Sequence, residues 1–124
     1  MIAADSSSLI AYFAGENGKD VLQIDEALAS FTLCLPPVVL TEVLSAPLGR
    51  KILGQRLDAC PLLDILPGYW ARAAITRGTL LSKGSRAKIP DALIAQSCID
   101  HDVALITRDA DFRPFAKHCG LKLA

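Results

Sequence analysis

The chain has 124 residues, the size of one ordinary domain, with a formal net charge of zero and 52% hydrophobic residues. This composition excludes an intrinsically disordered chain, and the balanced charge excludes a protein that holds nucleic acid by bulk positive charge. The net charge of zero is a sum of unequal segments: the charge balance is −5 over residues 1–49, +6 over residues 50–88 and −1 over residues 89–124. An acidic end and a basic middle within one domain indicate a charged site that faces a charged ligand.

Apolar runs and helical periodicity alternate along the first half of the chain, where Asp5 or Ser6 is placed to cap the first helix. In chain order this pattern predicts the strand Ile2–Ala4, a helix that Gly15 ends, a helix over 21–28, the strand Phe31–Leu35, and a helix that Pro36 and Pro37 open, that runs through Leu44 and that Pro47 closes.

The alternation continues in the second half, where Asp91 is placed to cap a helix. The predicted elements are a short helix with Ile52, Leu53 and Leu57, the strand Leu62–Leu66, a helix from Tyr69 to about Leu81, a loop over 83–90, the helix Ala92–Asp100, the strand Val103–Thr107, a short helix over 109–117 and an edge strand Gly120–Leu123. Because helices separate the strands, we predict one α/β domain over residues 1–124, a three-layer α/β/α sandwich with a central parallel sheet of about five strands.

The compartment is predicted from what the sequence lacks. No apolar run approaches the ~18 residues that a membrane span requires, and no basic segment precedes a long apolar stretch as in a secretory signal. The cysteines are far apart and form no C-x-x-C pair, so they indicate core thiols rather than a zinc site: Cys34, Cys60, Cys98 and Cys119. We therefore predict a cytoplasmic protein.

Acidic residues stand where parallel strands are predicted to end. Asp5 follows the first strand, Asp109 and Asp111 follow the strand Val103–Thr107, and Asp91 begins the helix that leads into that strand. Ligand sites in open parallel sheets form beyond the carboxyl ends of the strands, so these side chains are expected to share one edge. Each aspartate taken alone is also a common helix cap or turn residue.

Glu42 is harder to explain as an ordinary surface residue. Its predicted helix is apolar on nearly every side, which is typical of a buried helix, and no Lys or Arg lies within seven residues of Glu42. An unpaired buried carboxylate is very costly, so Glu42 is expected to have a partner from elsewhere in the chain.

Gathered carboxylates repel one another and take up protons unless a cation is present. Hard oxygen ligands without Cys or His favour Mg²⁺ or Mn²⁺, which activate water and neutralise phosphoryl charge. The bases of residues 50–88 would hold a phosphate backbone nearby. The residues alone thus favour metal-dependent phosphoester chemistry and do not choose a substrate.

Four motifs in this order and spacing give the chain a family resemblance over nearly its whole length. They are Asp5-Ser6-Ser7-Ser8-Leu9-Ile10, Thr41-Glu42-Val43-Leu44, Pro90-Asp91-Ala92-Leu93-Ile94-Ala95 and Leu105-Ile106-Thr107-Arg108-Asp109-Ala110-Asp111-Phe112. With these motifs the chain resembles the PIN-domain ribonucleases, and most closely the VapC toxins of VapBC toxin–antitoxin pairs.

The resemblance implies a PIN-like fold and an endoribonuclease that hydrolyses RNA with Mg²⁺ or Mn²⁺. It implies that the catalytic and metal-binding residues are Asp5, Glu42, Asp91 and Asp109, with Asp111 as an accessory ligand and with Ser7 and Thr107 as polar residues that orient water or a carboxylate. Members of this family are commonly homodimers, and a small antitoxin protein inhibits them by covering the active-site groove. Both partners are expected here.

Two further interpretations concern binding. Basic residues close to the predicted acids are candidates for RNA contact, namely Lys83, Arg86, Lys88 and Arg108, although a solvated surface is the simpler explanation of such charges. Two functions compete with a nuclease: a phosphoreceiver-like signalling domain, and a PIN-like module that has lost catalysis and only binds a partner. Asp5 has no acidic neighbour of the kind that a phosphoreceiver would need.

Overall fold

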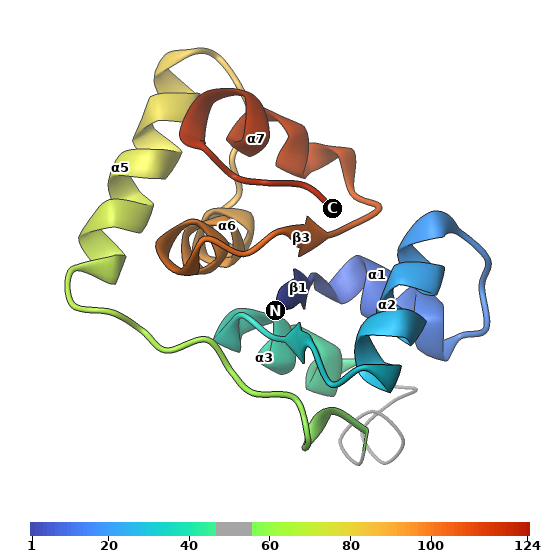
Figure 1. Cartoon of the computed structure of the whole chain (residues 1–124). Coiled ribbons are helices and arrows are strands. Elements are labelled where there is room, and N and C mark those ends of the chain that lie inside the picture. Colours follow the sequence, from blue (N-terminus) through green and yellow to red (C-terminus); the bar gives the residue numbers. More distant parts are fainter. Residues whose placement is uncertain (47–55) are drawn as a thin grey trace.

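The computed structural model describes residues 1–46 and 56–124 of the chain (Figure 1). Within these ranges a parallel sheet forms from β1 (Ile2–Ala4), β2 (Leu33–Cys34) and β3 (Leu105–Ile106), in the order β2-β1-β3. In the register of the sheet, Ala3 of β1 is paired with Cys34 on one side and with Leu105 on the other. The first strand of the sequence is therefore the central strand of the sheet.

The helices of the first half connect these strands. Helix α1 (Ser6–Phe13) and helix α2 (Lys19–Ala29) lie between β1 and β2 and pack against each other, and α3 (Pro37–Ser45) follows β2. The predicted signals explain their ends, since Asp5 is the N-cap of α1 and Pro37 lies in the first turn of α3, where a missing amide hydrogen costs nothing.

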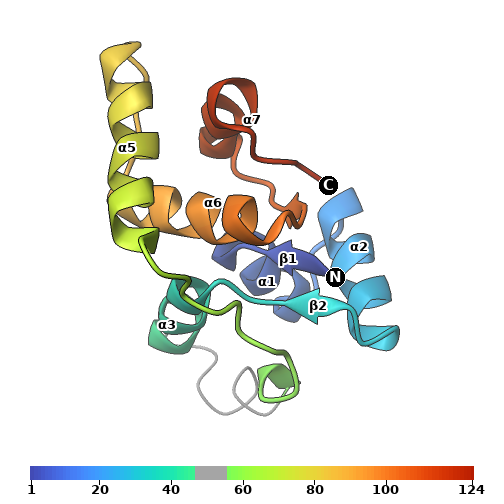
Figure 2. The same cartoon turned by 60° about the vertical axis from the view of Figure 1, so that its left-hand side comes forward.

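The second half supplies α5 (Tyr69–Ser82), α6 (Ile89–His101), the 3₁₀ turn η1 (Ala110–Phe112) and α7 (Arg113–Cys119). Helix α5 packs on α6 and α7, while α6 also contacts α3. Both views place the strands centrally, with α2 on one side and α5 on the other (Figures 1 and 2). This is the predicted α/β arrangement with a parallel sheet.

The prediction of about five strands is wrong, because the described residues contain a sheet of three. Each predicted outer strand contributes a single parallel bridge, Leu35 with Leu62 on one edge and Leu105 with Leu123 on the other. In the segment 62–66 only Leu63 is buried, and in the segment 120–123 only Leu121 is. Each outer segment therefore anchors itself by one leucine, and a longer ladder would bury little more apolar surface.

The sheet forms the centre of the core. Ala3, Ala4, Leu105 and Ile106 are fully buried. Cys34 and Cys98 are buried beside them as predicted, Cys60 and Cys119 are partly buried against the same core, and all four thiols are free. Burial raises the pKa of these thiols, which keeps them protonated and unreactive.

Two predictions fall on residues 47–55: the closing of a helix at Pro47 and the start of a short helix at Ile52 and Leu53. They lie outside the described residues. In the ranges that are described, no helix combines the length and the apolar character that crossing a bilayer demands.

Candidate functional site

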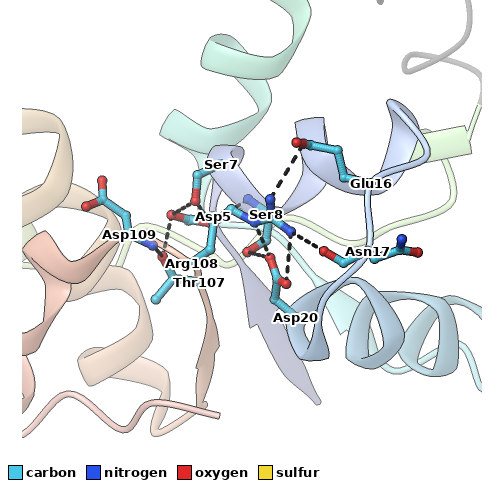
Figure 3. A network of polar contacts seen from close by, with 9 residues as sticks. All are labelled: Asp5, Ser7, Ser8, Glu16, Asn17, Asp20, Thr107, Arg108 and Asp109. Carbon is cyan, nitrogen blue, oxygen red and sulfur yellow. Dashed lines mark hydrogen bonds and ion pairs between the residues drawn. The ribbon is translucent and has the colours of Figure 1, made fainter.

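Asp5 occupies the first position after the central strand and is 2% exposed. It is the N-cap of α1, where its Oδ1 atom accepts a hydrogen bond of 3.0 Å from the amide of Ser8. The Ser7 hydroxyl donates to both carboxylate oxygens, at 2.9 and 2.8 Å, and the Thr107 hydroxyl donates to Oδ2 at 2.6 Å (Figure 3). Three donor groups, with the Ser7 hydroxyl shared between both oxygens, therefore fix the orientation of this carboxylate.

Burial raises the pKa of Asp5, and the charge of Asp109 raises it further. The hydrogen bonds from Thr107, Ser8 and Ser7 act in the opposite direction, because they favour the charged form. Asp5 is thus held in place as a hydrogen-bond acceptor, while the negative charge of Asp109 repels its charged form.

Thr107 joins the ends of two neighbouring strands. It follows β3, donates to Asp5, and accepts a hydrogen bond of 3.0 Å from the amide of Asp109. Asp109 in turn is the N-cap of η1 and accepts at 2.9 Å from the amide of Asp111. The capping role that aspartates commonly play and the predicted site role thus fall on the same side chains.

Three carboxylates gather beside this turn. Oxygens of Asp91, Asp109 and Asp111 lie within 4.8 Å of one another. The pKa of Asp91 rises to about 6, first because of burial and then because of the charges of Asp109 and Asp111. Lys88 lowers it, and Glu42 raises it by less than Lys88 lowers it. Asp111, ranked as accessory by the sequence, is part of this group.

The predicted capping role of Asp91 is wrong. Helix α6 begins at Ile89, so Lys88 is the N-cap and Asp91 lies in the first turn. The physical reason is Pro90, which fits the first turn of a helix and moves the start three residues towards the amino end. As a result the Asp91 carboxylate is not used by the helix end and faces Asp109 and Asp111.

Glu42 is half-buried, and the expectation of a wholly buried helix is also wrong. On α3 only Val39 and Val43 are buried, because the helix packs on one side against α1 and α6. The partner of Glu42 is a hydroxyl rather than a cation: Ser6 donates to its Oε1 atom at 3.1 Å. The carboxylate remains close enough to raise the pKa of Asp91.

Replacing Glu42 by Gln is expected to abolish activity while the fold is retained. The amide oxygen of Gln can still accept the hydrogen bond from Ser6. The change also removes the electrostatic repulsion between the carboxylates of Glu42 and Asp91. RNA cleavage and the melting temperature, measured side by side, check this. A melting temperature that falls strongly in the absence of metal would instead assign Glu42 a purely structural role.

The acidic residues fit a hard divalent cation. The group of three offers only carboxylate oxygens, which suit Mg²⁺ or Mn²⁺. The raised pKa of Asp91 reflects burial first and then repulsion from Asp109 and Asp111, which a bound cation would relieve. Asp91, Asp109 and Asp111 would hold the ion, with Asp5 and Glu42 at its margin. The role of Asp5 and Glu42 as metal ligands stays a prediction, because neither belongs to the group whose oxygens lie within 4.8 Å of one another.

The basic residues of the loop before α6 are exposed, as an RNA contact would require. Lys83, Arg86 and Lys88 are all exposed, and the Lys88 ammonium lies 4.0 Å from a carboxylate oxygen of Asp111. Lys88 thus borders the acidic group.

Arg108 is placed differently from these lysines and Arg86. Its guanidinium donates to Asp20 at 2.7 and 3.1 Å and to the Asn17 carbonyl at 3.2 Å, and it lies 3.6 Å from Glu16 (Figure 3). Asp20 also accepts a bond of 2.8 Å from Ser8. The sequence analysis missed Asp20 and Ser8. Asp20 lies in the first turn of α2, two residues after Gly18, and this position could have drawn attention to it. An acidic residue there is, however, common in helices because it interacts favourably with the helix dipole.

Two solved structures share the fold: FitAcB from Neisseria gonorrhoeae, with a TM-score of 0.72, 17% identity and coverage of 99% of this chain and 96% of that one; and VapBC2 from Rickettsia felis bound to a DNA fragment from their promoter, with a TM-score of 0.75, 20% identity and coverage of 100% and 98%. No curated protein matches the sequence. The family model of the PIN domain matches residues 2–118, so the chain belongs to the PIN domain family.

Proposed function

We propose that this chain is a metal-dependent endoribonuclease that acts as the toxin of a type II toxin–antitoxin pair in the cytoplasm. One observation carries the proposal: Asp91, Asp109 and Asp111 bring carboxylate oxygens within 4.8 Å of one another at the edge where three hydrogen-bond donors fix Asp5. Membership of the PIN family, whose members are typically nucleases, supports it. The same membership removes the phosphoreceiver alternative.

In this proposal the protein's own residues bind and orient. The acids hold the cation, Ser7 and Thr107 keep Asp5 in one orientation, and Lys88 places a positive charge beside the acids where the phosphate backbone would lie. A bound Mg²⁺ or Mn²⁺ would activate water for attack on the phosphodiester and stabilise the leaving oxygen.

The proposal is tested by sequencing RNA ends after expression of the wild-type chain and of the Asp5→Asn variant. New ends that appear only with the wild type are the expected result, because the variant lacks the carboxylate at the proposed catalytic site while Asn can still cap helix α1. Equal patterns of ends would reject the nuclease and favour the catalytically silent PIN-like module.

The loop before α6 is proposed to contact RNA. Replacing Lys83, Arg86 and Lys88 together by Ala is expected to weaken RNA binding. The slope of log affinity against log salt concentration should fall by the equivalent of about two to three phosphate contacts, since each cation that contacts a phosphate releases counterions from the RNA. Titration of RNA at several salt concentrations measures the slope. An unchanged slope would mean that these charges only solvate the surface.

Partners are proposed from the apolar surface. Trp70, Leu81 and Ile89 are 64%, 47% and 57% exposed around a hollow of about 280 Å³ between α5 and α6. Exposed apolar side chains gathered in this way are typical of interaction sites, and the similar structures are named as complexes, FitAcB and VapBC2. We propose that a second copy of the chain and a small antitoxin bind this protein.

A further inference from the structure

The Arg108 side chain connects the end of β3 to the segment between α1 and α2. It donates from Nε and Nη2 to the two carboxylate oxygens of Asp20, at 2.7 and 3.1 Å, and from Nη2 to the Asn17 carbonyl at 3.2 Å (Figure 3). The Asp20 side chain is only 11% exposed and that of Arg108 is 34% exposed. The contact with Arg108 lowers the pKa of Asp20 to about 2, so the pair is fully charged at neutral pH.

A short chain of hydrogen bonds leads from this pair to Asp5. The Ser8 hydroxyl donates to Asp20 at 2.8 Å, and the Ser8 amide donates to Asp5 at 3.0 Å. Thr107, the residue before Arg108, donates to the other oxygen of Asp5 at 2.6 Å. Asp5 is therefore held from both sides by groups that the pair ties together.

Gly18, the N-cap of α2, marks how closely the backbone approaches the pair. Its φ is 153°, and a Cβ added there would lie 2.5 Å from Oδ1 of Asp20 and 3.1 Å from Nη2 of Arg108. A side chain at position 18 would therefore displace the Asp20 carboxylate and crowd the Arg108 guanidinium. Gly15, in the same connection with φ 75°, has nothing within 4 Å of such a Cβ.

We propose that Arg108 and Asp20 are positioning residues, a pair that fixes the Asp5 carboxylate relative to Asp109 through Ser8 and Thr107, and that Arg108 therefore does not bind RNA. The inference rests on the proposed function. It replaces the role predicted for Arg108 from the sequence, since three of the five N–H donors of the guanidinium already bond to Asp20 and Asn17, and the remaining nitrogen, Nη1, lies 3.6 Å from Glu16.

A second ion pair in the molecule serves as a matched control. Arg72 donates to Asp100 from Nε at 3.0 Å and from Nη2 at 2.6 Å, with side chains 39% and 7% exposed. The bonds and burial resemble those of the pair Arg108–Asp20, but Asp100 lies nine residues along α6 from Asp91, about 13 Å at the rise of a helix. Breaking this pair is expected to cost a similar amount of stability and to leave Asp5 in place, because within residues 1–46 and 56–124 no hydrogen bond links Arg72 or Asp100 to Asp5.

The experiment compares Asp20→Asn, Arg108→Gln, their double variant and Gly18→Ala with the controls Asp100→Asn and Gly15→Ala. Mn²⁺ affinity is measured by calorimetry, and kcat and KM are measured on RNA. We expect the first four to lose about ten-fold or more in Mn²⁺ affinity and in kcat, with KM nearly unchanged, as is usual when residues that orient metal ligands are altered. The double variant should lose no more than the worse single one, and the controls should match the wild type in both.

The Asp20→Asn variant separates the possible roles of Arg108. If Arg108 contacts RNA, Arg108→Gln raises KM, and Asp20→Asn leaves kcat unchanged because it frees the guanidinium; this result overturns the inference. If all ion-pair variants, Asp100→Asn included, lower only the melting temperature, the role is structural and the inference is again overturned. Should Arg108→Gln fail to fold, Gly18→Ala still displaces the pair with both charges intact and decides the outcome.

Failure of the proposed function looks different. A wild-type protein that binds Mn²⁺ but does not cleave RNA rejects the nuclease, while the Mn²⁺ affinities of the variants still test the positioning pair. A wild-type protein that does neither overturns both.

Discussion

Cleavage of RNA by the purified protein is expected to fall about a thousand-fold or more when Asp5 is replaced by Asn, because several kcal/mol of transition-state stabilisation by a metal are lost. Asn caps a helix about as well as Asp, so α1 is expected to keep its start. The amide also removes a buried charge whose pKa is already raised by burial. Activity should therefore disappear without loss of the fold, and the melting temperature checks that it is retained.

Two controls accompany this variant. Asp64→Asn changes an exposed aspartate outside the acidic group and should cleave RNA as the wild type does. Addition of EDTA to the wild type should give the same loss as Asp5→Asn, and excess Mg²⁺ or Mn²⁺ should reverse it. Undiminished cleavage in EDTA would disprove the dependence on metal.

Opposite effects on activity and stability are expected for Asp91→Asn. Cleavage of RNA should be lost, because the variant lacks one of the proposed metal ligands. Above pH 6 the metal-free variant should nevertheless be more stable than the metal-free wild type. The sign follows from the pKa of Asp91, which is about 6 in the folded protein and about 4 when unfolded. Such a group stabilises the fold below pH ~4, and that contribution is lost as the pH rises through about 6.

The size of this effect is moderate because solvent screens the half-buried Asp91. We expect about 1 kcal/mol at pH 7.5, or about 4 °C in melting temperature. The measurement is thermal unfolding in EDTA at pH 5 and pH 7.5, with Asp58→Asn as an exposed control. Mn²⁺ should then stabilise the wild type more than the variant. A variant that is less stable than the wild type at pH 7.5 would contradict the prediction that the charged Asp91 carboxylate destabilises the metal-free fold.

Local sequence signals predicted the helices well. The apolar spacing after Gly68 gave a helix from Tyr69 to about Leu81, and α5 covers Tyr69–Ser82. The outer strands were overestimated because an apolar run such as 62–66 does not reveal whether both of its neighbours are present. Pairing partners are set by tertiary structure, and only one bridge forms there.

The candidate site was predicted in part for the same reason. Aspartates after strands could be placed at one edge because parallel strands end together, and Asp91, Asp109 and Asp111 do gather. The pair Arg108–Asp20 could not be predicted, since it joins residues 88 positions apart and each has an ordinary local explanation. The half-exposed state of Glu42 likewise depends on which side of α3 is packed, and that is decided by α1 and α6.

The central position of β1 has a consequence for protein synthesis. Asp5 is translated well before the hydroxyl that fixes it, which belongs to Thr107, 102 positions later, directly after the strand β3 that pairs with β1. Asp109 and Asp111 are translated after β3 as well. A nascent or truncated chain that stops before β3 therefore lacks two of the three gathered carboxylates and the hydroxyl that orients Asp5, so the proposed site is assembled only after residues 105–111 have been added.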